Sequence, residues 1–169
     1  MTTQNIPKLP GLIKRKVLAW QRKHWLERCM LGPAFLLLGV MRALLLVLPF
    51  RAISKHLGQH LQTLNVVPLA GQVAVFRAEQ IGKAIRTAAR YTPWESKCLA
   101  QAMVARALLG LYGIPYALYL GVNRAGTSKM AAHAWVCVGP IAVTGGDSFA
   151  EFTIVGTFVA PQIIERQWL

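Results

Sequence analysis

The first two thirds of the chain carry apolar residues at helical spacing, whereas the last third is rich in residues that favour strands. The pattern predicts helices over 11–30, 34–48, 52–64 and 72–90, and a further helix that ends near 111. The predicted strands cover 116–122, 132–138, 141–144 and 152–155. Helices followed by a meander of strands predict an α+β fold.

Two start signals precede the last predicted helix. Thr92-Pro93-Trp94-Glu95 has the pattern of a capping box with proline in the first helical position. Ser96 offers a second N-cap. Gly113 follows the helix as a natural C-cap, and Pro115 bars its continuation.

The best internal boundary is the segment 65–70, which contains Pro68. It predicts two parts. Residues 1–70 form a basic, apolar and helical N-terminal segment, and residues 71–169 form a domain that combines the remaining helices with all the strands.

The apolar run from Met30 to Phe50 is long enough to span a bilayer. Arg42 near its middle would cost about 2.5–3.5 kcal/mol there. Pro33 and Pro49 are expected to shorten the continuous helix to about fifteen residues. We therefore expect this segment to pack on the domain, on a partner or on a membrane surface, without spanning the membrane.

Charge is concentrated at the start of the chain. The 19 Lys and Arg against 6 Asp and Glu give a formal charge of +13, and residues 1–60 contain ten of the basic residues but one acid, Glu27. Such a segment favours an anionic partner. The predicted docking cluster comprises Lys14, Arg15, Lys16, Arg22 and Lys23. Nucleic acid is not the predicted partner, because stacking residues are not interleaved with the basic ones.

The three cysteines are Cys29, Cys98 and Cys137. Their odd number and wide spacing fit neither a disulfide framework nor a zinc site, and the polar start of the chain does not read as a secretory signal. The four histidines are also scattered. We expect a protein of the reducing cytoplasm without a metal or other cofactor.

Cys98, His133 and Asp147 suggest a catalytic triad, because they follow one another in separate elements. With Ser96 as the N-cap, Cys98 falls in the first turn of its helix, where the helix dipole favours a thiolate; with Thr92 as the cap it falls in the second turn. His133 lies within a strand and is expected to face a helix packed on the sheet. Taken singly, each residue also has a structural explanation, as a core cysteine, a strand histidine and a turn aspartate.

The ordered motifs add a family resemblance. They are Cys98-Leu99, Gly113-Ile114-Pro115, Gly121-Val122 and the run Ala132-His133-Ala134-Trp135-Val136. Over residues 72–160 the chain resembles the transglutaminase-like cysteine peptidases that remove leader peptides in lasso-peptide biosynthesis, known as the B protein.

The resemblance implies a transglutaminase-like or papain-like core, in which a helix bearing the cysteine packs on an antiparallel sheet. It implies that Cys98 is the nucleophile and His133 the base. The family's acid lies about a dozen residues after the histidine, where this chain has Gly145. Either Asp147, fourteen residues after His133, orients the imidazole, or the site is a dyad assisted by the backbone.

The resemblance also implies partners. These are a precursor peptide, a leader-recognition protein made separately from this chain, and a lasso cyclase. The predicted function is leader removal through an acyl-enzyme in the cytoplasm, with contact to a membrane surface left open. The alternatives are an acyltransferase or amidase that uses the same triad, and a non-catalytic scaffold associated with a membrane.

Overall fold

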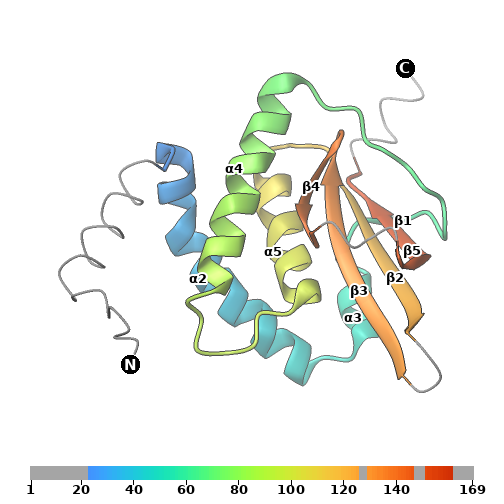
Figure 1. Cartoon of the computed structure of the whole chain (residues 1–169). Helices are drawn as coiled ribbons and strands as arrows, with labels where there is room; N and C mark the ends of the chain where they lie inside the picture. The colour runs from blue at the N-terminus through green and yellow to red at the C-terminus, as the bar shows by residue number, and fades with distance from the viewer. Residues whose placement is uncertain (1–22, 126–128, 147–150, 162–169) are drawn as a thin grey trace, which may run out of the picture.

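The computed structural model describes residues 23–125, 129–146 and 151–161 of the 169-residue chain. The helices are α2 (Trp25–Val47), α3 (Phe50–Ser54), α4 (Gln72–Ala89) and α5 (Cys98–Leu111). The strands are β1 (Gln59–His60), β2 (Ala117–Ala125), β3 (Lys129–Val138), β4 (Ile141–Thr144) and β5 (Thr153–Val159). Helices α4 and α5 lie against one face of the sheet, and α2 packs across both helices (Figure 1). The predicted α+β class is confirmed.

The sheet has five antiparallel strands in the order β1-β5-β2-β3-β4. Strands β2 and β3 form a long hairpin that pairs Ala117 with Cys137 and Ala125 with Lys129. The chain then crosses from β4 at one edge to β5, which pairs with the other side of β2. This topology places the middle of β3 beside Gly121 of β2, which is the register partner of His133.

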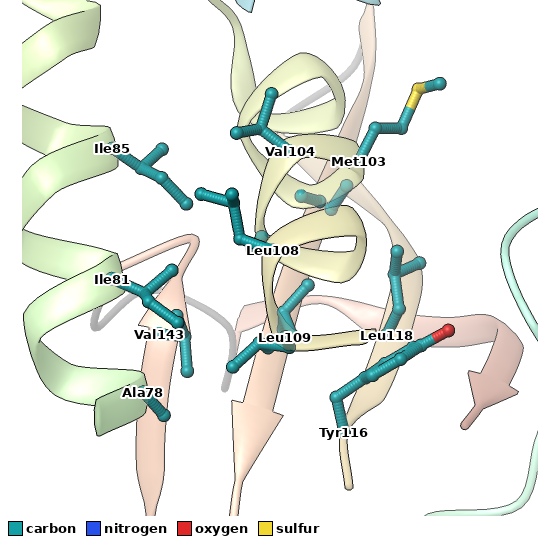
Figure 2. Packing of buried hydrophobic residues seen from close by; sticks show 14 of the residues in the cluster. Ala78, Ile81, Ile85, Met103, Val104, Leu108, Leu109, Tyr116, Leu118 and Val143 are labelled. Atoms are coloured by element: carbon teal, nitrogen blue, oxygen red, sulfur yellow. The ribbon is translucent and has the colours of Figure 1, made fainter. Parts of the chain in front are cut away.

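The main core lies between the helices and the sheet. Alternate residues of β3, Ala134 and Val136, point into it from the sheet. Figure 2 shows Ile81 and Ile85 of α4 pointing toward α5, and Leu108 of α5 belongs to the same buried cluster. All five side chains are almost fully buried. Each fully buried Leu, Ile or Val stabilises the fold by about 1.5–3 kcal/mol relative to an exposed one.

A second, smaller cluster covers the opposite face of the sheet. Trp135 stacks on Tyr119 with 5.4 Å between ring centroids, and both are almost fully buried. The Tyr119 hydroxyl donates a hydrogen bond to the carbonyl oxygen of Val66. Burial raises the pKa of Tyr119 to about 12, so its hydroxyl remains protonated as a donor at neutral pH. Both faces of β3 are therefore apolar.

Helix α2 continues through Pro33 and has 23 residues, so the prediction that this proline shortens the continuous helix is wrong. The ring of Pro33 is exposed, and a proline removes the hydrogen bond of one backbone N–H, a loss that packing on the other face of α2 offsets. His24 caps the helix by accepting a hydrogen bond from the Leu26 N–H at 3.2 Å. By length and apolar composition the 23-residue helix is sufficient to cross a membrane. The part of the predicted helix before residue 23 lies outside the described residues.

The predicted helix over 52–64 is also wrong. Helix α3 ends at Ser54, and Gly58 then takes a φ of +130°, which a helix does not accommodate. A Cβ on Gly58 would collide with the Val159 carbonyl oxygen, because the chain passes close to β5 here. Residues Gln59 and His60 pair with β5 as strand β1. Pairing with a segment about one hundred residues away thus overrides the local helical pattern.

Contacts cross the predicted boundary at residue 70 extensively. Ala34, Leu38, Ile53 and Leu57 belong to the same buried cluster as α4 and α5. The division into 1–70 and 71–169 stays a prediction about sequence organisation, since the described part of the first segment shares its core with the second.

Candidate active site

Cys98 is the first residue of α5, and Lys97 is its N-cap. Neither of the two predicted caps is used. The hydroxyls of Thr92 and Ser96 lie 2.8 Å apart and hydrogen-bond to each other. This arrangement places Cys98 closer to the helix start than either predicted cap would.

The loop before Cys98 is held in place by hydrogen bonds at both ends. Thr92 Oγ1 donates to the Ala89 carbonyl oxygen at 3.0 Å, and Gln101 Nε2 donates to the Ser96 carbonyl oxygen at 2.8 Å. Because Gln101 lies one turn into α5, this second bond ties the loop to the helix that it precedes. Cys98 therefore lies between a loop that is anchored by Thr92 and a helical turn that is tied to the loop by Gln101.

Two side chains of this loop also rest on α2. The ring of Trp94 packs against Phe35 at 5.3 Å between centroids, and Glu95 pairs with Arg42 at 3.3 Å. Glu95 pairs with Lys97 as well, at 3.0 Å, and the hydrogen bond from this ammonium lowers the pKa of the Glu95 carboxyl.

Cys98 is half-buried and packs at the border of the main core. Backbone N–H groups in the first turn of a helix have no partner within the helix, and they attract negative charge. They therefore provide donors for an oxyanion beside Cys98.

The other two cysteines differ from Cys98 in their surroundings. Cys137 lies on β3 and is half-buried, and burial raises the pKa of its thiol to about 11. Cys29 is exposed on α2 rather than packed in the core. A thiolate at neutral pH is thus disfavoured at Cys137.

His133 lies in β3 on the face of the sheet that carries the second cluster. Its ring stacks on Trp135 with 5.9 Å between centroids and contacts Phe152 at 4.9 Å. A Cβ on its register partner Gly121 would meet the same two side chains. The expectation that the imidazole faces α5 is therefore wrong, because α5 packs on the face to which Ala134 points.

The His133 ring is oriented by the backbone just after β4. Its Nε2 atom lies 2.7 Å from the Gly145 carbonyl oxygen. A carbonyl oxygen can only accept a hydrogen bond, so Nε2 carries the proton and donates it. This bond leaves Nδ1 as the basic nitrogen of the ring.

Gly145 is suited to this approach because it lacks a side chain. Its φ is +97°, and a Cβ would collide with that of Trp135. Gly145 stands twelve residues after His133, where the resemblance places an acid. The sequence signal for it is the Gly145-Gly146 pair, which directly precedes the predicted turn residue Asp147.

No hydrogen bond joins Sγ of Cys98 to the His133 ring, although both residues lie in the described part of the chain. Asp147 lies outside the described residues. The roles of all three residues stay a prediction, and the structure supplies the Gly145 carbonyl as an orienting group for His133.

A cavity of 440 Å³ lies apart from these residues, between α2 and the end of α4. Its lining is mostly apolar and includes Leu31, Phe35 and Tyr91, together with the polar side chains of Lys23 and Thr87. Neither Cys98 nor His133 lines it. Lys23 also pairs with the buried Glu27, whereas the rest of the predicted basic cluster, Lys14, Arg15, Lys16 and Arg22, lies outside the described residues.

Comparison with known protein families matches residues 44–157 to the transglutaminase-like superfamily. The match begins inside α2 and ends within β5, so it includes α5, the β2–β3 hairpin and Gly145. Neither the curated proteins nor the solved structures gave a match. Because the family match covers more than half of the sequence, this chain belongs to the transglutaminase-like superfamily.

Proposed function

We propose that this protein is a cysteine peptidase that removes the leader from a ribosomally made lasso-peptide precursor. The superfamily is one of cysteine-based enzymes. The observation that carries the proposal is the position of Cys98 as the first residue of α5, in a chain whose His133 has its Nε2–H held by a backbone carbonyl. The motifs around both residues support the choice of substrate through their resemblance to the leader peptidases.

In the proposed reaction, Sγ of Cys98 attacks the scissile carbonyl of the precursor. Nδ1 of His133 takes the thiol proton and then gives it to the leaving amine. Water hydrolyses the acyl-enzyme, with His133 acting again as base. Backbone N–H groups at the start of α5 bind the oxyanion in both steps.

The reaction requires Sγ of Cys98 and Nδ1 of His133 to come within hydrogen-bond reach in the substrate complex. Because the His133 ring lies with Trp135 on the face of the sheet opposite α5, this contact requires the ring or the start of α5 to move, which is a larger change than the tightening of a long hydrogen bond. The orienting group is either Asp147 or the Gly145 carbonyl. A carboxylate would stabilise the imidazolium through its charge, whereas a carbonyl fixes mainly the tautomer.

The proposed partners are the precursor, a separate leader-recognition protein and a cyclase that acts on the released core. The proposed compartment is the cytoplasm. The basic N-terminal third, with ten Lys and Arg against one acid, would dock an acidic leader or an acidic recognition protein.

Mass spectrometry of a full-length precursor incubated with the protein tests the proposal, with and without the recognition protein. We expect cleavage at the leader boundary, loss of cleavage in Cys98→Ala and His133→Ala, and retention in the exposed-cysteine control Cys29→Ala. Asp147→Ala should slow the reaction without abolishing it if the Gly145 carbonyl suffices. Full activity of Cys98→Ala would overturn the proposal.

The same assay separates hydrolysis from transfer, because both reactions pass through one acyl-enzyme. Added hydroxylamine should yield a small share of hydroxamate if water is the natural acceptor. Product that forms only when an amine acceptor is present would favour the acyltransferase. If the protein is a non-catalytic scaffold, no product should form under any condition, and no cysteine should be alkylated faster than an ordinary thiol.

A further inference from the structure

The outer face of α2 is apolar along its whole length. Leu36, Val40 and Val47 are 70%, 52% and 79% exposed, although all are large aliphatic residues. The exposed positions recur every three or four residues, so they form one face of the helix. Between Trp25 and Val47 this face extends about 33 Å, at about 1.5 Å per residue.

Charged side chains are absent from this face. Of the three in α2, Glu27 is buried, Arg42 pairs with Glu95, and Arg28 donates through Nε to the Lys23 carbonyl oxygen. Each exposed position in α2 is a Trp, Cys, Gly, Pro, Ala, Leu or Val. A surface helix normally presents polar residues to water, so an apolar face of this size indicates a surface that is covered in use.

The opposite face of α2 shows that the helix does not leave the domain. Ala34 and Leu38 are fully buried in the main core, and Phe35 carries the ring of Trp94. If α2 crossed a bilayer, these contacts with the rest of the domain would be broken. A helix that is half packed on protein and half apolar toward the outside fits a position in the plane of a membrane interface.

The charge near the outer face of α2 indicates what kind of partner surface covers it. Beyond the C-terminal end of the face, Arg51 and Lys55 are exposed, and the whole chain carries +13. Trp25 lies at the other end and is 64% exposed, and tryptophan is enriched where a membrane meets water. An anionic bilayer complements both the apolar face and the positive charge.

We propose that the outer face of α2, defined by Trp25, Cys29, Leu36, Val40, Leu44 and Val47, docks on an anionic lipid bilayer with the helix parallel to the membrane surface. The aliphatic side chains enter the boundary between headgroups and acyl chains. The basic residues beside them bind lipid phosphates. This docking depends on surface exposure and charge and is independent of the proposed peptidase activity.

Vesicle co-sedimentation of the full chain tests the proposal. Vesicles of phosphatidylcholine with phosphatidylglycerol are compared with vesicles of phosphatidylcholine alone, across a salt series. We expect strong binding to the anionic vesicles, weaker binding to the neutral ones, and release as salt rises. The variant Leu36→Gln/Val40→Gln should reduce binding about tenfold or more, because two aliphatic side chains no longer enter the bilayer.

A matched control uses the same residue types away from α2. Leu64 and Val155 are 61% and 50% exposed, close to the values for Leu36 and Val40, so Leu64→Gln/Val155→Gln should bind like the unmodified chain. Circular dichroism checks that both variants are folded.

Three results would overturn the docking proposal. The first is failure of the unmodified chain to bind either vesicle, and a dimer detected by light scattering would then assign the face to a second copy. The second is an equal loss of binding in both double variants. The third is retention in carbonate-washed membranes from expressing cells, which would indicate that α2 spans the bilayer.

Discussion

Replacement of Gly145 by alanine perturbs the carbonyl that accepts the His133 hydrogen bond. The backbone there has a φ of +97°, which costs a residue with a Cβ about 1–2 kcal/mol. The new Cβ would also collide with the Cβ of Trp135 and lie 3.1 Å from the Ala134 carbonyl oxygen. Relief of such overlap costs about 1–3 kcal/mol more. We expect the free energy of unfolding to fall by about 2–5 kcal/mol, a large part of a typical domain's stability.

Gly146 provides the matched control. Its φ is +66°, but a Cβ there meets no heavy atom within 4 Å. Gly146→Ala should therefore cost only the left-handed conformation, about 1 kcal/mol.

Urea unfolding followed by circular dichroism measures both variants, and ¹⁵N NMR of the His133 ring reports its tautomer. We expect a fixed Nε2–H in the unmodified chain and in Gly146→Ala, and a mixture of tautomers in Gly145→Ala. Equal losses of stability, together with an unchanged His133 spectrum in both variants, would refute the argument that Gly145 orients the imidazole.

Three further changes have defined outcomes. Tyr116→Phe should lower the free energy of unfolding in urea by about 1–2 kcal/mol, because the buried hydroxyl donates to the Leu57 carbonyl at 3.0 Å; an unchanged midpoint would contradict this. Burial raises the pKa of Cys137 to about 11, so peptide mapping should show its alkylation rate still rising about tenfold per pH unit near pH 9, rather than levelling off. Since Lys97 lowers the pKa of Glu95, the NMR titration of this carboxyl should move up toward its usual range in Lys97→Met, and an unmoved titration would assign the shift elsewhere.

Local patterns predict α4, α5 and the β2–β3 hairpin well because their signals lie within each segment. Helix α4 covers Gln72–Ala89, against a predicted 72–90. Gly113 takes a φ of +61° just after α5, as the C-cap signal predicts. The residues from 52 to 64 could not be predicted in the same way, because strand β1 depends on β5, which the chain reaches only about one hundred residues later.

The orientation of His133 shows a different limit. Ala134, Val136 and Val138 form one apolar face of β3, while Trp135 and Cys137 belong to the other apolar cluster. When both faces of a strand are apolar, alternation shows which residues share a face but not which face receives the helices. His133 is two residues before Trp135, so the two side chains share a face of the strand. Only the packing of α5 against Ala134 shows that this face is the one turned away from the helices.

Helix α2 connects the proposed membrane surface with the proposed nucleophile. Its outer face is apolar, while its inner face carries Trp94 through Phe35 and holds Glu95 through Arg42. Trp94 and Glu95 belong to the loop that ends at Cys98, so the start of α5 rests partly on α2. A Cβ on Gly39 would lie 2.9 Å from the Trp94 ring, which shows how closely the two segments approach. For this reason α2 is part of the domain's core rather than a separate anchor, and the proposed docking face lies on the side of α2 opposite the residues that hold the loop before Cys98.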